Sequence, residues 1–251
     1  MEKIKISLSW SGGKDSAFAL WKLLNDERYE VAGLHTTLGE ESCRVGMHGI
    51  HEELIDAQAA ALGLRLDKIY YPASGDNAAY EKAMEKYLLG LDSDGVKHIA
   101  YGDILLEDLK QYREEKLAEK GFSGIFPLWG SDTKALAEEF LQSGFKTKIC
   151  AADADKISKD WVGGDFDREF LAQLPLDVDP CGENGEFHSF CYDGPIFSKA
   201  LDISCKAVIQ QSYDILLENG DKEKKIYWFG EIKAKAKALK IGKPHGAQRI
   251  R

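Results

Sequence analysis

Residues 9–16 read Ser9-Trp10-Ser11-Gly12-Gly13-Lys14-Asp15-Ser16 and join a strand-like run at residues 3–9 to a helix-like run at 14–26. Two glycines let the backbone turn sharply and approach an anion without a Cβ in the way. The helix that follows directs unpaired N–H groups and its positive dipole end at that anion. The serines add hydroxyl donors, and Lys14 adds a positive charge. The stretch therefore predicts a phosphate-binding loop within an α/β domain.

The spacing of this loop is not that of a Walker A loop, which has four residues between its first Gly and its Gly-Lys pair. A shorter loop suits a pyrophosphate. In isolation a Gly-Gly-Lys turn would indicate only a turn before a helix, but its position between strand and helix favours phosphate. The predicted nucleotide-binding residues of the loop are Ser9, Ser11, Gly12, Gly13, Lys14, Asp15 and Ser16.

The first 150 residues alternate between strand-like and helix-like stretches, which predicts parallel strands with crossover helices in a doubly wound α/β sheet. One detail fits imperfectly, because Ile6 and Leu8 alternate with Lys5 and Ser7, whereas a strand covered on both faces should be continuously apolar. Strands are expected near residues 3–9, 30–37, 65–71, 97–101, 123–128 and 146–151, and helices near 14–26, 49–62, 77–90, 107–120 and 132–143.

The texture of the sequence changes after about residue 175, where strand-like pieces alternate with turn signals such as Asp193-Gly194-Pro195. This predicts a second, smaller α+β domain. We expect the ATP-binding domain to span residues 1–130, the smaller domain 131–232 and a basic C-terminal tail 233–251.

The 251 residues are 44% apolar and 30% charged, which is ordinary globular composition. The five cysteines form no Cys-x-x-Cys pair, which argues against a disulfide framework or a structural zinc site. No apolar run approaches the length of a membrane span, and Met1-Glu2-Lys3 leads straight into a strand-like run. We therefore expect a cytoplasmic protein that makes no membrane contact.

The net charge of −9 disfavours binding to the negatively charged backbone of a nucleic acid. The last nineteen residues, from Lys233, hold seven Lys or Arg and no acid, which leaves residues 1–232 with 26 basic and 42 acidic residues, a net charge of −16. The basic tail is consistent with a solvated terminus or with RNA docking. We expect no nucleic-acid partner.

Two loops that follow strands carry further candidates, because open α/β sheets bind ligands at this edge. In the first, Arg44 and His48 are positioned to bind an anionic substrate, although a solvated Arg and a locally bonded His would fit a plain helix entry. In the second, Gly102 lets a base or ribose pack closely, and Asp103 offers an acceptor for a ribose hydroxyl or a Mg²⁺ ligand.

The helix after Asp103 carries further substrate-binding candidates, Tyr112 and Arg113. An alternative for Arg113 is an ion pair with Asp108 or Glu114 on its own helix.

A third candidate stretch opens the second domain and reads Asp179-Pro180-Cys181-Gly182-Glu183-Asn184-Gly185-Glu186-Phe187-His188. Two carboxylates three residues apart can hold a cation, orient an ammonium or act as a base, and His188 would share the face of Glu186 on a strand. The alternative is an acidic turn that only solvates a hairpin.

The run from Ser11 to Ser16 resembles the signature of the PP-loop ATP pyrophosphatases, which adopt the adenine nucleotide alpha hydrolase-like fold. The resemblance implies cleavage of ATP between its α and β phosphates and adenylylation of a substrate oxygen. Together with the other stretches and Pro127-Leu128-Trp129, residues 4–200 resemble the diphthine-ammonia ligase branch, also called diphthamide synthetases.

That resemblance implies an enzyme that uses ATP, Mg²⁺ and ammonium to convert a carboxylate into an amide. In the family, the carboxylate belongs to diphthine, a modified histidine of elongation factor two. Asn184 stands where many members carry Gly, and this variant looks more like a bacterial offshoot, for which diphthamide is not expected. The acceptor therefore stays open between a small molecule and a modified protein histidine. The catalytic residues implied are Lys14, Asp15, Glu183, Glu186 and His188, with Asp15 also the metal ligand.

Two alternatives use the same loop. A tRNA-modifying PP-loop enzyme would use the basic tail to dock RNA, and an ATP-binding sensor would bind the nucleotide without turnover. The sequence also leaves open whether the chain forms a homodimer.

Overall fold

Two β-sheets form the frame of the chain in a computed structural model that describes residues 2–72, 77–216, 222–235 and 249–250. The first sheet is parallel, with strand order β10-β3-β2-β1-β4-β5. Its strands are β1 (Ile4–Ser9), β2 (Tyr29–Gly39), β3 (Leu66–Tyr71), β4 (His98–Ala100), β5 (Ser123–Ile125) and β10 (Arg249–Ile250).

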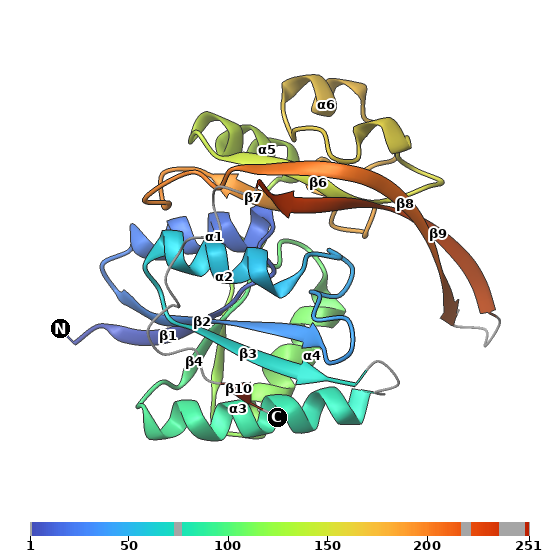
Figure 1. Cartoon of the computed structure of the whole chain (residues 1–251). Coiled ribbons are helices and arrows are strands. Elements are labelled where there is room, and N and C mark those ends of the chain that lie inside the picture. Colours follow the sequence, from blue (N-terminus) through green and yellow to red (C-terminus); the bar gives the residue numbers. More distant parts are fainter. Residues whose placement is uncertain (1, 73–76, 217–221, 236–248, 251) are drawn as a thin grey trace.

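Crossover helices connect the parallel strands. They are α1 (Lys14–Leu24), α2 (Glu52–Leu62), α3 (Asn77–Ser93) and α4 (Glu107–Ala118). Helices α1 and α2 lie between the two sheets, and α3 covers the opposite face of the first sheet (Figure 1). The predicted doubly wound sheet is confirmed, and the order of β1 to β5 places the phosphate loop at the carboxyl end of its central strand.

The polar residue of β1 that disturbed the apolar pattern lies in the core. Ser7 is 1% exposed, and its hydroxyl lies 2.9 Å from Nδ1 of His35 and 2.7 Å from the Tyr87 hydroxyl. These two partners from β2 and α3 satisfy the buried hydroxyl, so a serine is tolerated in a strand that is covered on both faces. Lys5 lies near the exposed beginning of the strand.

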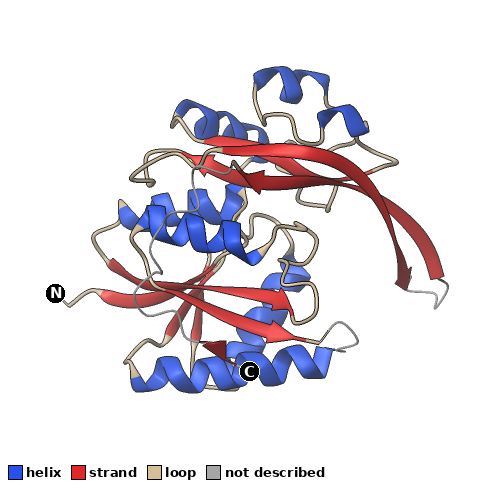
Figure 2. Cartoon of the chain, in the orientation of Figure 1, coloured by secondary structure: helices blue, strands red, loops and turns tan. Residues whose placement is uncertain are grey.

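The second sheet is antiparallel, with strand order β7-β6-β9-β8. The expectation that residues 146–151 continue the parallel sheet is wrong, because this segment is β6 and pairs antiparallel with β7 and β9. Helices α5 and α6 lie on the far side of this sheet (Figure 2). The elements of this unit are α5 (Thr133–Gln142), β6 (Lys146–Asp153), a 3₁₀ turn (Lys159–Trp161), α6 (Arg168–Gln173), β7 (Phe187–Asp193), β8 (Ile203–Leu216) and β9 (Lys222–Ala234).

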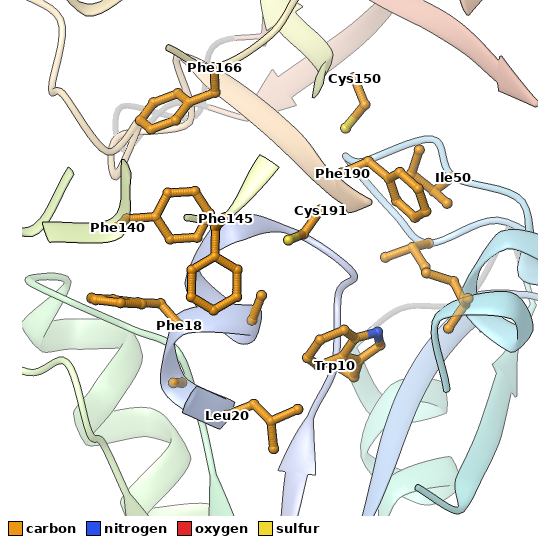
Figure 3. Packing of buried hydrophobic residues seen from close by; sticks show 14 of the residues in the cluster. Trp10, Phe18, Leu20, Ile50, Phe140, Phe145, Cys150, Phe166, Phe190 and Cys191 are labelled. Carbon is orange, nitrogen blue, oxygen red and sulfur yellow. The ribbon is translucent and has the colours of Figure 1, made fainter. Parts of the chain in front are cut away.

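A shared apolar core fixes the second sheet against α1. The Phe18 ring of α1 meets Phe140 of α5 at 5.6 Å and Phe145 at 5.9 Å between ring centroids, both edge-on, and the latter two rings stack at 4.8 Å. Phe190 and Cys191 of β7 are fully buried in the same cluster (Figure 3). This packing places β7 in contact with the phosphate loop, and the candidate site lies at that contact.

The C-terminal segment reaches both sheets. Lys233 ends β9 together with Ala234, and Arg249–Ile250 forms β10 beside β3. The rest of the predicted basic tail, 236–248 and Arg251, lies outside the described residues, and the proposed domain limits stay predictions. Among the helices that are described, none is long and apolar enough to cross a membrane.

Candidate active site

A cavity of about 490 Å³ opens where the phosphate loop meets the second sheet. Its wall combines the loop, the segment after β4, the start of α4 and the turn before β7. The sequence-predicted residues that line it are Ser9, Ser11, Lys14, Asp15, Ser16, His48, Gly102, Asp103, Arg113, Glu183 and His188.

The loop is held by backbone bonds to the second sheet. Gly12 adopts a φ of +81°, and its carbonyl accepts hydrogen bonds from Cys191 N at 2.8 Å and from Gln58 Nε2 at 2.9 Å. The buried Gln58 also accepts from Trp10 Nε1 at 2.9 Å and donates to the Cys191 carbonyl at 2.6 Å. Gln58 therefore ties α2, the loop and β7 together.

The start of α1 is enclosed just as closely. Gly13 is the N-cap of the helix, and a Cβ on it would lie 2.8 Å from His48 Cε1 and 3.0 Å from the Ser189 carbonyl oxygen. The N–H of Lys14 donates to Ser189 Oγ at 3.1 Å, and Ser16 Oγ donates to the Gly13 carbonyl at 3.0 Å. Only glycine fits at position 13 without displacing β7 or His48.

The Lys14 side chain is 4% exposed and bridges the two units. Its Nζ lies 2.6 Å from Asp15 Oδ1 and donates to the carbonyl of Cys181. Burial lowers the pKa of this ammonium, but Asp15, Cys181 and Glu183 together raise it above its ordinary value. Lys14 is therefore a fixed positive charge at the floor of the cavity.

The segment after β4 forms a second wall. A Cβ on Gly102 would lie 2.9 Å from the carbonyl carbon of Asp15 and 3.0 Å from Ser16 N, so the glycine allows the segment to touch the start of α1. Asp103 pairs with Arg113, whose guanidinium lies 4.2 Å from the Tyr101 ring centroid. Burial raises the pKa of the Asp103 carboxyl, Arg113 opposes this effect, and Asp15 adds to it.

Glu183 closes the cavity from the second unit. Its Oε2 accepts from the N–H of Ile104 at 3.2 Å and of Leu105 at 3.1 Å, which links the turn before β7 to the segment after β4. Burial raises the pKa of this carboxyl, and so does the charge of Asp15, while Lys14 and the two N–H groups lower it. Glu183 and Lys14 therefore line the same cavity and interact electrostatically.

Two histidines, His48 and His188, line the cavity beside the loop. The rings of His48 and His188 are 4.8 Å apart between centroids, and His48 Nδ1 lies 3.0 Å from the Ser189 carbonyl. Burial lowers the pKa of His48. Burial, His48 and Lys14 hold the pKa of His188 well below its usual range. Both rings are therefore neutral at pH 7, and the surroundings of His188 disfavour its protonated form.

Five predicted residues do not line the cavity, namely Gly12 and Gly13 of the loop, Arg44, Tyr112 and Glu186. Arg44 donates to the Gly49 carbonyl at 2.6 Å and closes its own loop, and the Tyr112 hydroxyl donates to Glu81 Oε1 at 3.0 Å. Glu186 is 4% exposed, and its carboxylate accepts from Asp179 N, Asn184 N and Asn184 Nδ2 at 3.0, 2.9 and 2.9 Å. It shapes the turn that presents Glu183.

Several wall residues were not predicted as site residues, in part because backbone groups carry their contacts. Cys181 contributes its carbonyl to Lys14, and Ser189 contributes both its hydroxyl and its carbonyl. The aromatic Tyr101 supports Arg113, and its position beside Gly102 was the one available sequence signal. Others in the wall are Leu106, Gly182, Asn184, Gly185 and Phe187.

The donor set suits a nucleotide triphosphate. The first N–H groups of a helix have no intrahelical acceptor. In α1 the N–H of Lys14 is taken by Ser189 Oγ, and the next two residues of the helix, Asp15 and Ser16, line the cavity together with Ser11 and Lys14. Mg²⁺ typically takes one or two carboxylates together with substrate phosphates, and Asp15 and Asp103 supply two carboxylates in this wall. The described residues contain no cluster of three or more His, Cys, Asp or Glu that would hold a metal without phosphate.

The same two units coincide with two known domain families. The pattern of the diphthamide synthase N-terminal domain matches residues 4–123, and that of the diphthamide synthase C-terminal domain matches residues 132–235. The chain belongs to the diphthamide synthase family. Members of this family use ATP, in agreement with the loop and cavity described above.

Relatives of the diphthamide synthase family that are similar to this chain are distant. A diphthine-ammonia ligase of Danio rerio is 26% identical over 239 residues, which cover 81% of this chain and 88% of the relative. A diphthine-ammonia ligase of Homo sapiens is 25% identical over 238 residues, which cover 84% of this chain and 87% of the relative. One of Schizosaccharomyces pombe is 24% identical over 220 residues, 80% of this chain but only 36% of that longer protein.

Proposed function

We propose that the chain is an ATP-dependent ammonia ligase that adenylylates a substrate carboxylate and converts it into an amide. The observation that carries the proposal is that the phosphate loop shares one cavity with Glu183 and His188 of the second unit. Ligation requires two steps, adenylylation and then attack by ammonia. An anion site serves the first step, and a carboxylate and an imidazole in the same cavity serve the second.

In the first step, a carboxylate oxygen of the acceptor attacks the α phosphorus of ATP, the bond to the β phosphate breaks, and pyrophosphate leaves. The helix N-terminus of α1 and the Lys14 ammonium stabilise the charge that develops on the leaving group. Their positions are set before reaction by the bonds of Lys14 to Asp15, Cys181 and Ser189. Mg²⁺, when bound near Asp15 and Asp103, would neutralise phosphate charge.

In the second step, ammonia attacks the acyl carbon and AMP leaves. The carboxylate of Glu183 is the group suited to hold an ammonium ion, because it faces the cavity with one oxygen already fixed by two N–H donors. The same carboxylate, whose pKa burial raises, is the group suited to accept the proton released as the amide forms. The imidazole of His188 is unprotonated at pH 7 because of its low pKa, and it can accept a hydrogen bond from the attacking ammonia. Water exclusion by β7 and its turn protects the adenylate.

The acceptor is a carboxylate-bearing small molecule or a modified protein histidine such as diphthine, after which the related ligases are named. We propose the cytoplasm as the location of the reaction, as the sequence predicts. A tRNA-modifying enzyme and an ATP sensor are the competing functions. The net charge of −9 and the carboxylate opposite the loop favour the ligase.

Isotope exchange between pyrophosphate and ATP tests the proposal. Exchange should depend on one member of a panel of carboxylates that includes a diphthine-bearing elongation factor, and should not need ammonium. Glu183→Gln should retain exchange but form little amide. Exchange that depends on tRNA, or tight ATP binding without exchange under every condition, would replace the ligase with one of its competitors.

A further inference from the structure

Strand β8 is the outer edge of the second sheet. It pairs with β9 along one side and, among the described residues, has no strand on the other. The β8–β9 hairpin extends well past the body of the sheet (Figure 1). Soluble proteins usually blunt such edges with charges, proline or short length. This strand has 14 residues, and its segment Ala207-Val208-Ile209-Gln210-Gln211-Ser212-Tyr213 carries neither charge nor proline.

This edge segment is both exposed and apolar. Residues 206–213 are all exposed, and Val208, Ile209 and Tyr213 keep 38%, 40% and 36% of their surface in solvent. Tyr213 is the one aromatic residue among the large exposed apolar side chains of the described chain. An uncovered strand of this composition is typical of a surface that pairs with another strand.

The side chains on one face of the segment are ordered by contacts within the hairpin. Ile209, Gln211 and Tyr213 share this face because they alternate along the strand, and they pair with Phe229, Tyr227 and Lys225 of β9. The Tyr213 ring meets Tyr227 edge-on at 6.1 Å, and its hydroxyl donates to Gln211 Oε1 at 2.8 Å. The pattern Ile-x-Gln-x-Tyr is therefore presented in a fixed geometry.

This pattern is complementary to itself. A two-fold axis through Gln211 aligns two antiparallel β8 strands so that Ile209 of each copy faces Tyr213 of the other, and the two Gln211 carboxamides face each other. A two-fold contact requires this reciprocity, in which residue i meets j and j meets i. Aromatic and β-branched side chains directly opposite each other are a favourable cross-strand pair.

The charge distribution permits the same contact. The chain carries a net charge of −9, so two copies repel each other over most approaches. Within residues 206–213 the one charged residue is Lys206, at the end of the segment and away from the axis. We propose that the β8 edge is the contact surface of a homodimer, in which two copies pair antiparallel about Gln211 and join their four-stranded sheets.

Sedimentation equilibrium of the full-length protein tests this dimer. The mass should approach twice the chain mass of 28.0 kDa at high concentration and fall toward the single-chain value on dilution. Gln211→Lys should raise the dissociation constant at least tenfold, because it opposes two ammonium groups at the axis. Gln210→Lys is the matched control, since it adds the same charge on the other face and off the axis. The thermal midpoint of each variant checks that the monomer is folded.

Cross-linking gives a second, independent readout. Opposed residues of an antiparallel pair have Cβ atoms about 4.5–5.5 Å apart, close to the reach of a disulfide. Gln211→Cys should therefore form a covalent dimer under mild oxidation, and Gln210→Cys and the native cysteines should not. A monomer at all concentrations, or a dimer that Gln211→Lys leaves intact, would overturn the proposal and leave β8 to a different partner. None of these outcomes depends on the ligase chemistry.

Discussion

The backbone N–H of Lys14 donates to Oγ of Ser189 at 3.1 Å and joins the first residue of α1 to strand β7 of the second sheet. The carbonyl of the same serine accepts from His48, if Nδ1 of that ring carries the proton, at 3.0 Å. The phosphate loop is therefore completed by a residue 175 positions away in the sequence, and the second unit is part of the nucleotide site.

Ser189→Ala should weaken both folding and ATP binding. It removes the acceptor of a buried N–H, which costs about 1–3 kcal/mol of unfolding free energy, and it loosens the first turn of α1. Thermal unfolding and ATP titration measure the two effects. Ser143→Ala is the control, because that hydroxyl donates to the Glu139 carbonyl at the C-terminal end of α5. Equal ATP affinity in wild type and Ser189→Ala would contradict the role of Ser189.

Gly102→Ala should raise the KM for ATP and lower stability. The added Cβ would lie 2.9–3.0 Å from backbone atoms of Asp15 and Ser16, which are not free to move, and overpacking of this kind costs about 1–3 kcal/mol. Gly90→Ala is the matched control. Position 90 lies within α3 and has open space around it, so alanine there should stabilise the helix by roughly 0.5–1 kcal/mol. An unchanged KM for Gly102→Ala would show that the close approach is dispensable.

Glu183→Gln and Glu186→Gln should have different effects. A glutamine at 183 can still accept from Ile104 and Leu105, so the fold and ATP binding should persist while amide formation falls by about 100-fold or more. At 186 an amide would turn donors toward the N–H groups of Asp179 or Asn184, so stability should fall by about 1–3 kcal/mol. Denaturant titration and amide yield separate the two roles. A stable Glu186→Gln variant with lost turnover would instead give Glu186 the chemical role.

The stability of the protein should decline in acid partly because of His35. Burial, aided by the charge of Arg113, lowers the pKa of this imidazole to about 3. The unfolded chain takes up a proton below about pH 6.5 while the folded chain does not. The contribution is therefore complete above pH 6.5 and decreases as the pH falls toward 3, by about 1.4 kcal/mol per pH unit.

Unfolding free energies of wild type and His35→Gln, measured from pH 7 to pH 5, test this linkage. The advantage of the wild type should shrink as the pH falls. A constant difference between the two proteins would show that His35 does not titrate as the burial predicts.

The sequence predicted the first sheet well because its signals are local. Apolar residues recur along β1 to β4, although Lys5 and Ser7 interrupt them in β1. Gly63 ends α2 in the left-handed conformation expected of a helix stop. Residues 146–151 form the predicted strand but belong to the other sheet. An apolar run reveals that a strand is buried, whereas its partner depends on packing of Phe18 and Phe145 across distant elements.

The sequence predicted those parts of the site whose role depends on the type of side chain. One cavity is lined by residues of the loop together with Gly102, Asp103 and Glu183. Each of these was predicted from a short motif of charged and small residues. The carbonyl of Cys181 and the contacts of Ser189 escaped prediction, because any residue type has a carbonyl and a lone serine is common. Glu186 has the same chemistry as Glu183 but faces inward, and only the turn conformation distinguishes them.

The most direct test of the central claim is the fate of ATP labelled in its α phosphate, incubated with Mg²⁺, ammonium and a panel of carboxylates that includes a diphthine-bearing factor. An acceptor labelled with ¹⁸O in its carboxylate should yield AMP that carries one ¹⁸O atom, and Lys14→Ala should lower AMP formation by about 100-fold or more, whereas Lys22→Ala on the same helix should not. Formation of ADP, with ¹⁸O in inorganic phosphate, would contradict adenylylation.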